Sequence, residues 1–157
     1  MGVGFTGDWQ RCMKVLDDLA DKTKGEVGKK IGQSIKKIEA KVLDHVDNQD
    51  LGWEEPDAGY AAQKDRKGLS PDILQAGNQM YINITTRQDD DFTGAVGVRC
   101  GMKNDEGGDV TDIAVIQEPP DNDGNNIPAR DLWQPTFDEI KEEIPPEIMG
   151  GVTGLIE

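Results

Sequence analysis

The chain has 157 residues, a length that suits one domain with a modest core. Only 35% of the residues are apolar, which is below the globular average, and 31% are charged. The formal net charge of −14 at pH 7 argues against a nucleic-acid binder, because phosphate contacts need clustered Lys and Arg.

The charge is unevenly distributed. Residues 1–46 carry nine basic and seven acidic side chains, whereas residues 47–157 carry eight basic and 24 acidic ones. An acidic half of this kind is either simply solvated or attracts a basic partner. We expect no membrane span, since no apolar run approaches ~20 residues, and we see no signal peptide.

The first predicted element is a long amphipathic helix over residues 8–46, capped by Asp8. Its apolar side chains recur every three or four residues and so form one stripe. The stripe consists of Trp9, Cys12, Met13, Leu16, Leu19, Ala20, Thr23, Val27, Ile31, Ile35, Ile38, Val42 and Val46. Gly25, Gly28 and Gly32 indicate either a break between two helices or a surface that another backbone approaches closely.

Residues 48–67 read as a loop that Gly52, Pro56 and Gly59 punctuate. A short helical turn is predicted over residues 60–67. A second short helix is predicted to start at Ser70 or Leu69, followed by Pro71, and to close at residues 75–77.

Strands are predicted at residues 79–87 and 94–100, and the acidic loop between them makes an antiparallel hairpin. Residues 110–117 form a third strand or a short helix, because Ala and Gln blur the alternation. Residues 118–126 are rich in Pro, Asn, Asp and Gly and predict a loop.

A final amphipathic helix is predicted to start at Asp131 and to stop at Pro145-Pro146. Its stripe consists of Leu132, Thr136, Phe137, Ile140 and Ile144. We therefore expect one α+β domain over residues 1–146, with a long N-terminal helix and a C-terminal helix packed on a small antiparallel sheet. Residues 147–157 are expected to be a flexible C-terminal arm.

No motif predicts catalysis, a cofactor or a metal. His45 stands alone and is expected to be a packed or surface residue. Cys12 and Cys100 have no metal-ligand spacing and are expected to be reduced thiols, with a single bridge between them as the alternative. The acidic run at residues 89–91 is expected to be a solvated loop, so we expect no enzyme.

Several short motifs follow one another in an order that resembles a known family. The series begins with Trp53, Pro56, Tyr60 and Lys64 and continues with ILQAGNQMYINI. It then contains, in order, AVGVRC, IAVIQEPP and PARDLWQPTFDEI. This series resembles the tail-completion and head–tail joining proteins of tailed phages, which include the HK97-type neck component and the lambda-type tail-completion protein Z. The chain departs from the family pattern at Asp131, where proline is usual, and at Trp133.

The resemblance implies a structural protein of the virion neck or upper tail that forms a homo-oligomeric ring, commonly of six subunits. Neighbouring neck, tail-terminator or connector proteins would be its partners. It would be made in the host cytoplasm and would end in the virion. Membrane and sequence-specific nucleic-acid partners are not expected.

The turn before the last helix raises a more specific hypothesis. Pro128 stiffens the chain, Ala129 allows close approach, and Arg130 and Trp133 are residue types that interfaces favour. These four residues are predicted to form an assembly interface, unless Arg130 and Trp133 instead pack within the subunit. The predicted core anchors are Trp53, Tyr60, Leu74, Phe137 and Ile140. An acidic inhibitor that mimics nucleic-acid charge is the alternative function.

Overall fold

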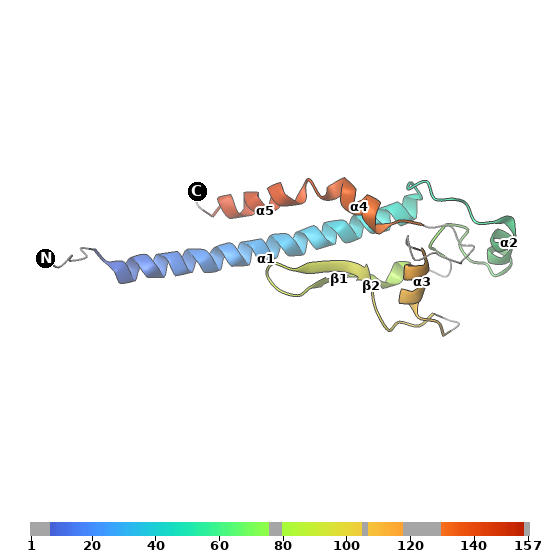
Figure 1. Cartoon of the computed structure of the whole chain (residues 1–157), viewed down its shortest axis with the longest axis horizontal. Coiled ribbons are helices and arrows are strands. Elements are labelled where there is room, and N and C mark those ends of the chain that lie inside the picture. Colours follow the sequence, from blue (N-terminus) through green and yellow to red (C-terminus); the bar gives the residue numbers. More distant parts are fainter. Residues whose placement is uncertain (1–6, 76–79, 105–106, 118–129, 156–157) are drawn as a thin grey trace.

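The structure is a computed structural model that describes residues 7–75, 80–104, 107–117 and 130–155. It confirms the α+β class, with a long N-terminal helix, helices at the C-terminal end and a small antiparallel sheet. The molecule is elongated, and its other elements gather along and beyond the C-terminal half of the first helix (Figure 1).

The long helix α1 spans Trp9–Asn48, which is 40 residues or about 60 Å. It begins where the Asp8 carboxylate accepts the backbone N–H of Arg11 at 3.1 Å. Its C-cap is Gln49, which has a left-handed φ of 54° and donates its N–H to the His45 carbonyl at 2.9 Å. The predicted helix over residues 8–46 is confirmed.

The glycines of α1 do not break the helix. A Cβ on Gly28 would lie 3.2 Å from the Cα atom of Asp91, and Gln88 Nε2 donates to the Gly28 carbonyl at 2.8 Å. Gly28 therefore lets the hairpin lie directly on the helix. Of the two interpretations of these glycines, the close backbone approach is confirmed at Gly28 and the break is wrong.

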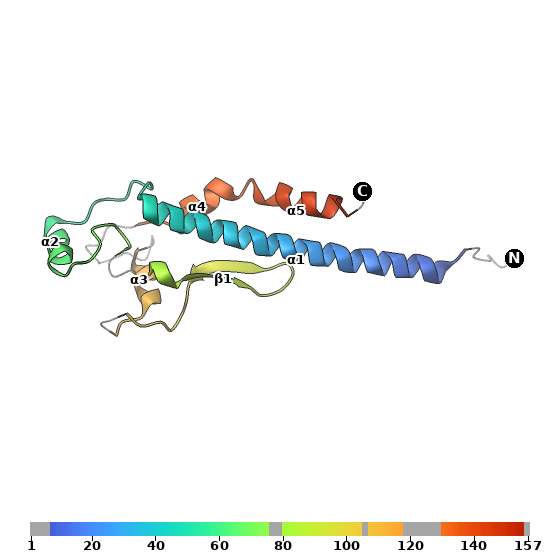
Figure 2. The same ribbon diagram turned by 180° about the vertical axis from the view of Figure 1, so that it is seen from behind.

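The hairpin consists of β1 (Ile84–Gln88) and β2 (Gly94–Val98), which pair antiparallel with Ile84 opposite Val98. The prediction of a hairpin is confirmed, but its first strand is shorter than expected, because a 3₁₀ turn, η2 (Tyr81–Asn83), occupies its start. Figure 2 shows the hairpin on one side of α1 and the C-terminal helices on the other.

Residues 110–117 form helix α3 (Val110–Gln117), so a third strand is the wrong interpretation and the short helix is the correct one. The Asp109 carboxylate accepts the N–H of Thr111 at 2.9 Å, which satisfies a donor at the start of the helix. The sheet among the described residues has two strands.

Helix α2 (Ala58–Arg66) confirms the turn expected at residues 60–67 and begins two residues earlier, because Asp57 caps its N-terminus. The short helix expected from Pro71 is wrong. Residues 71–74 make a bend and a turn, and Leu74 has a positive φ of 62°, which a helix does not allow.

The C-terminal segment contains two helices, α4 (Trp133–Ile140) and α5 (Ile144–Thr153). The prediction that Pro145 and Pro146 end a helix is wrong, because both lie in the first turn of α5, where their missing N–H groups need no partner. The flexible arm expected from residue 147 is accordingly helical as far as Thr153.

Helix α5 runs back along α1. Lys37 Nζ of α1 bridges the carboxylates of Glu143 and Glu147 at 2.5 and 2.7 Å. Gly151 lies so close to Lys30 that a Cβ there would be 2.7 Å from Lys30 Cε. These contacts attach the C-terminal segment to the middle of α1.

The core lies at the C-terminal half of α1, where the hairpin, α3 and the start of α4 converge. Its buried cluster consists of Val42, Val46, Met80, Ile84, Val110, Ala114 and Leu132. The N-terminal half of α1 contributes nothing to this cluster.

Candidate assembly surface

The turn before α4 faces inward. Pro128 and Ala129 lie outside the described residues, whereas Arg130 is 6% exposed and Trp133 packs, partly buried, against the core. Burial lowers the pKa of the Arg130 guanidinium, because desolvation disfavours its charge. The alternative reading of Trp133 as a residue that packs within the subunit is confirmed, and neither side chain forms an open surface on the subunit.

Local hydrogen bonds hold this turn against the core. The indole N–H of Trp53 donates to the Asp131 carbonyl at 3.1 Å. The Asp131 carboxylate in turn accepts the N–H of Gln134 at 3.2 Å, although the N-cap position of α4 is Leu132, one residue later than predicted. Thr136 Oγ1 donates to the Leu132 carbonyl at 2.6 Å, and both residues are fully buried.

The predicted core anchors divide into two groups. Ile140 is buried, and Trp53 and Leu74 are partly buried against the core, as expected. Tyr60 and Phe137 are wrong as anchors, because they are 45% and 47% exposed. Thr136 and Ile140 are the buried residues of α4 and fill its inner face, so Phe137, one residue along, turns toward solvent.

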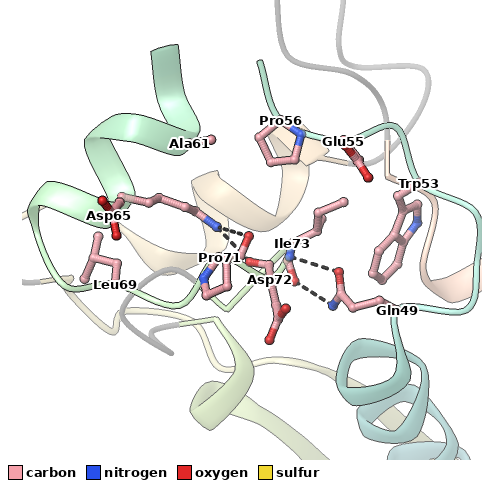
Figure 3. Close-up of a pocket in the computed structure, with 11 residues that line it drawn as sticks. Gln49, Trp53, Glu55, Pro56, Ala61, Asp65, Leu69, Pro71, Asp72 and Ile73 are labelled. Atoms are coloured by element: carbon pink, nitrogen blue, oxygen red, sulfur yellow. Dashed lines mark hydrogen bonds between the residues drawn. The ribbon is translucent and has the colours of Figure 1, made fainter. Parts of the chain in front are cut away.

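A pocket of about 520 Å³ lies beside α2, and Figure 3 shows the residues around it. Gln49 joins its two sides, donating to the Ile73 carbonyl at 3.0 Å and accepting the Ile73 N–H at 2.9 Å. Lys64 is 3% exposed and donates to the carbonyls of Asp72 and Pro71 at 2.7 and 3.4 Å. Because the Lys64 ammonium donates to these two carbonyls, we infer that it holds the loop at residues 71–72 against α2.

His45 is buried between two carboxylates. Its Nδ1 lies 2.6 Å from Asp50 Oδ1, and its Nε2 lies 3.1 Å from Glu139 Oε2 on α4. Lys41 also binds Glu139, at 2.9 Å, and its hydrogen bond is the main cause of the lowered pKa of that carboxyl. The hydrogen bond from His45 likewise lowers the pKa of Asp50. The prediction of a packed histidine is confirmed, and the group attaches α4 to the end of α1.

The other titratable groups singled out in the sequence offer no joint chemistry. Cys12 and Cys100 are free and exposed. Asp89 pairs with Arg87, and Asp91 pairs with Lys24. Within the described residues, no group of three or more His, Cys, Asp or Glu side chains could hold a metal ion.

Among the described residues, the N-terminal half of α1 gathers several exposed apolar side chains. Six side chains on one face of it, here called the N-terminal stripe, are exposed or, for the last two, partly exposed beside the hairpin tip. They are Trp9, Met13, Leu16, Ala20, Thr23 and Val27. Met13 and Leu16 are 63% and 59% exposed, and the N-terminal end of α1 projects beyond every other element (Figure 1).

A shallow groove of about 420 Å³ lies where the stripe meets the tip of the hairpin. Phe92, 61% exposed, forms its far wall. Leu16, Leu19, Ala20, Thr23, Lys24 and Val27 of α1 complete the lining. The sequence predicted an apolar stripe along α1 correctly. Its periodicity alone does not tell which half of the stripe other elements of the chain cover.

No family model, curated protein or solved structure matches the chain. The family resemblance therefore rests on the ordered motifs. In the described part of the chain, no helix is both long enough and apolar enough to cross a membrane.

Proposed function

We propose that the chain is a structural protein of a phage neck or upper tail. It assembles as a ring, for which six subunits is the usual number in the family it resembles, completes the tail and helps to join it to the head. The observation that carries the proposal is the ordered motif series from Trp53 to Ile140, which resembles the tail-completion and neck proteins.

The shape of the subunit supports an assembly role in general. The first turns of the 40-residue helix lie outside the fold, and every residue from Trp9 to Lys22 is exposed. A single copy in water gains little from keeping such a surface ordered, whereas a subunit of a larger assembly buries it against a neighbour. The neighbours in this proposal are other copies, the tail terminator and connector proteins.

Particles made without the chain test the proposal. The phage genome is propagated with the coding sequence interrupted, and the particles are imaged by electron microscopy. Heads without tails, or tails that remain unjoined, are expected, and supplying the chain from a plasmid restores joined particles. Normal infectious particles in its absence would overturn the proposal.

The acidic character of residues 49–157, with eight basic and 23 acidic side chains, favours a second candidate. A protein of this charge can compete with DNA for a basic protein. Several of these acids are already paired inside the subunit, as Glu143 and Glu147 are with Lys37. Displacement of DNA from a basic host protein by the purified chain, with normal particle assembly in its absence, would favour this candidate.

A further inference from the structure

The N-terminal stripe has the spacing of a helix–helix contact. Its six residues follow one another at alternating intervals of four and three, from Trp9 to Val27. That alternation is the a/d pattern of packed helices, in which side chains of one helix fit between those of another. The stripe is about 28 Å long at 1.5 Å per residue, enough for two helices to pack over several turns.

In the C-terminal half of α1, other elements of the chain already cover the apolar stripe. Ile35, Val42 and Val46 continue the stripe and are 8%, 0% and 1% exposed, because the hairpin and the C-terminal segment cover them. The hairpin stops covering this face of α1 near Gly28, which lies against Asp91 at the hairpin tip. The N-terminal stripe is thus the uncovered continuation of a face that the fold buries elsewhere.

Charge indicates which partner fits. Residues 8–27 carry four basic and five acidic side chains, whereas residues 49–157 carry eight and 23. Two copies at −14 each repel one another overall, and the repulsion is weakest where both signs are interspersed. A strongly basic partner would instead be drawn to residues 49–157.

We propose that the N-terminal stripe binds the same stripe, with its Phe92-lined groove, on a second copy of this chain. The two helices pack along residues 9–27, and side chains from one copy fill the groove beside Phe92 of the other. The contact is twofold, because the same stripe serves both copies, so by itself it makes a pair and a ring needs a second contact surface. The inference rests on the proposed role as an assembly protein for the place of such a pair in the neck, and it puts one subunit contact on α1, away from Arg130 and Trp133.

The first experiment measures the mass of the full-length chain by analytical ultracentrifugation from low to high micromolar concentration. We expect association that increases with concentration and with added salt, since salt screens the repulsion between copies. Leu16→Asp should weaken association at least about tenfold, because an unpaired carboxylate buried in an apolar contact costs more than that factor represents.

Val15→Asp is the matched control. Val15 is as exposed as Leu16, at 58% against 59%, and takes the same substitution in the same turn, but it lies off the stripe. It should associate like the unchanged chain. Equal weakening by both variants, or a chain that remains monomeric at the highest concentration, would overturn the inference. Circular dichroism of each variant checks that the helix content is unchanged.

The two free cysteines supply a local measurement. Cys12 lies beside the stripe, and Cys100 follows β2. In a Cys100→Ser chain, the reaction of Cys12 with a thiol reagent should slow over the concentrations at which copies associate. In a Cys12→Ser chain, the reaction of Cys100 should stay constant. Association without protection of Cys12 would show that the copies meet elsewhere, and the inference would fail.

Failure of this inference is distinguishable from failure of the proposed function. If the chain associates through the stripe but particles form normally without it, the self-contact is correct and the phage role is wrong. If joining needs the chain but Leu16→Asp neither changes its mass nor blocks joining, the role stands and the stripe is not the contact.

Discussion

Replacing Phe137 or Ile140 by alanine tests which face of α4 packs against the rest of the fold. Both residues lie on α4, three positions apart, and both are large and apolar. Ile140 is 5% exposed, whereas Phe137 is 47% exposed. A sequence pattern alone treats them as equivalent members of one stripe, so their energetic difference depends only on the structure.

The magnitudes follow from burial. Full burial of a Phe side chain contributes at most about 3 kcal/mol, so burying half contributes roughly 1.5, and alanine recovers roughly 0.5 through its helix propensity. Phe137→Ala should therefore lower the free energy of unfolding by about 1 kcal/mol. Ile140→Ala removes buried carbons and leaves a cavity, at about 3 kcal/mol.

Urea denaturation followed by far-UV circular dichroism measures both changes. In a chain of this size 1 kcal/mol corresponds to roughly 2–4 °C, so melting temperatures should fall by about 3 °C for Phe137→Ala and by about 9 °C for Ile140→Ala. A loss for Phe137→Ala as large as that for Ile140→Ala would refute the placement of α4 on α1.

Other perturbations test the remaining contacts. Folding lowers the pKa of Glu139, so the stability that its carboxylate contributes is present above the ordinary carboxyl pKa and is lost as the pH falls through the folded pKa. Glu139→Gln should therefore flatten the decline in the free energy of unfolding below about pH 4, which urea midpoints measure. A Cβ added at Gly25 would meet nothing within 4 Å, so Gly25→Ala should stabilise α1 by up to about 1 kcal/mol. Gly28→Ala should instead destabilise the fold, because the new Cβ would push Asp91 away. An equal gain in stability at both sites would contradict the close contact between Gly28 and Asp91. Lys64→Ala should cost about 1–3 kcal/mol in the same assay, because two loop carbonyls lose their donor, and a neutral result would mean that water replaces it.

The sequence predicted the elements that a single strong signal determines. The period of three and four from Trp9 to Val46 predicted α1 almost to the residue, and the acidic loop between two β-rich runs predicted the hairpin. Both signals are local, because amphipathic periodicity and turn composition belong to the element itself.

The errors occurred where one local pattern is compatible with two structures. Pro145-Pro146 ends one helix as readily as it begins another, and only the ion pairs of Lys37 with Glu143 and Glu147 show that α5 continues along α1. The sequence pattern places both Thr136 and Phe137 on the stripe of the last helix, but only Thr136 is buried, and its hydroxyl can be buried because it donates to the Leu132 carbonyl. The inward position of Arg130 and the pairing of His45 with Glu139 depend on tertiary packing.

The unequal support of α1 leads to a last prediction, on hydrogen exchange. Helices form in water mainly because tertiary packing buries one face, and an unsupported segment opens locally far more often than the fold as a whole. In the monomer, amides of residues 12–23 should therefore exchange orders of magnitude faster than those of residues 38–46, although one helix contains both. Where copies associate, protection of residues 12–23 should rise while that of residues 38–46 stays constant, and the Leu16→Asp chain should show no rise. Uniform slow exchange along α1 in a verified monomer would mean that the N-terminal stripe needs no partner to stay helical.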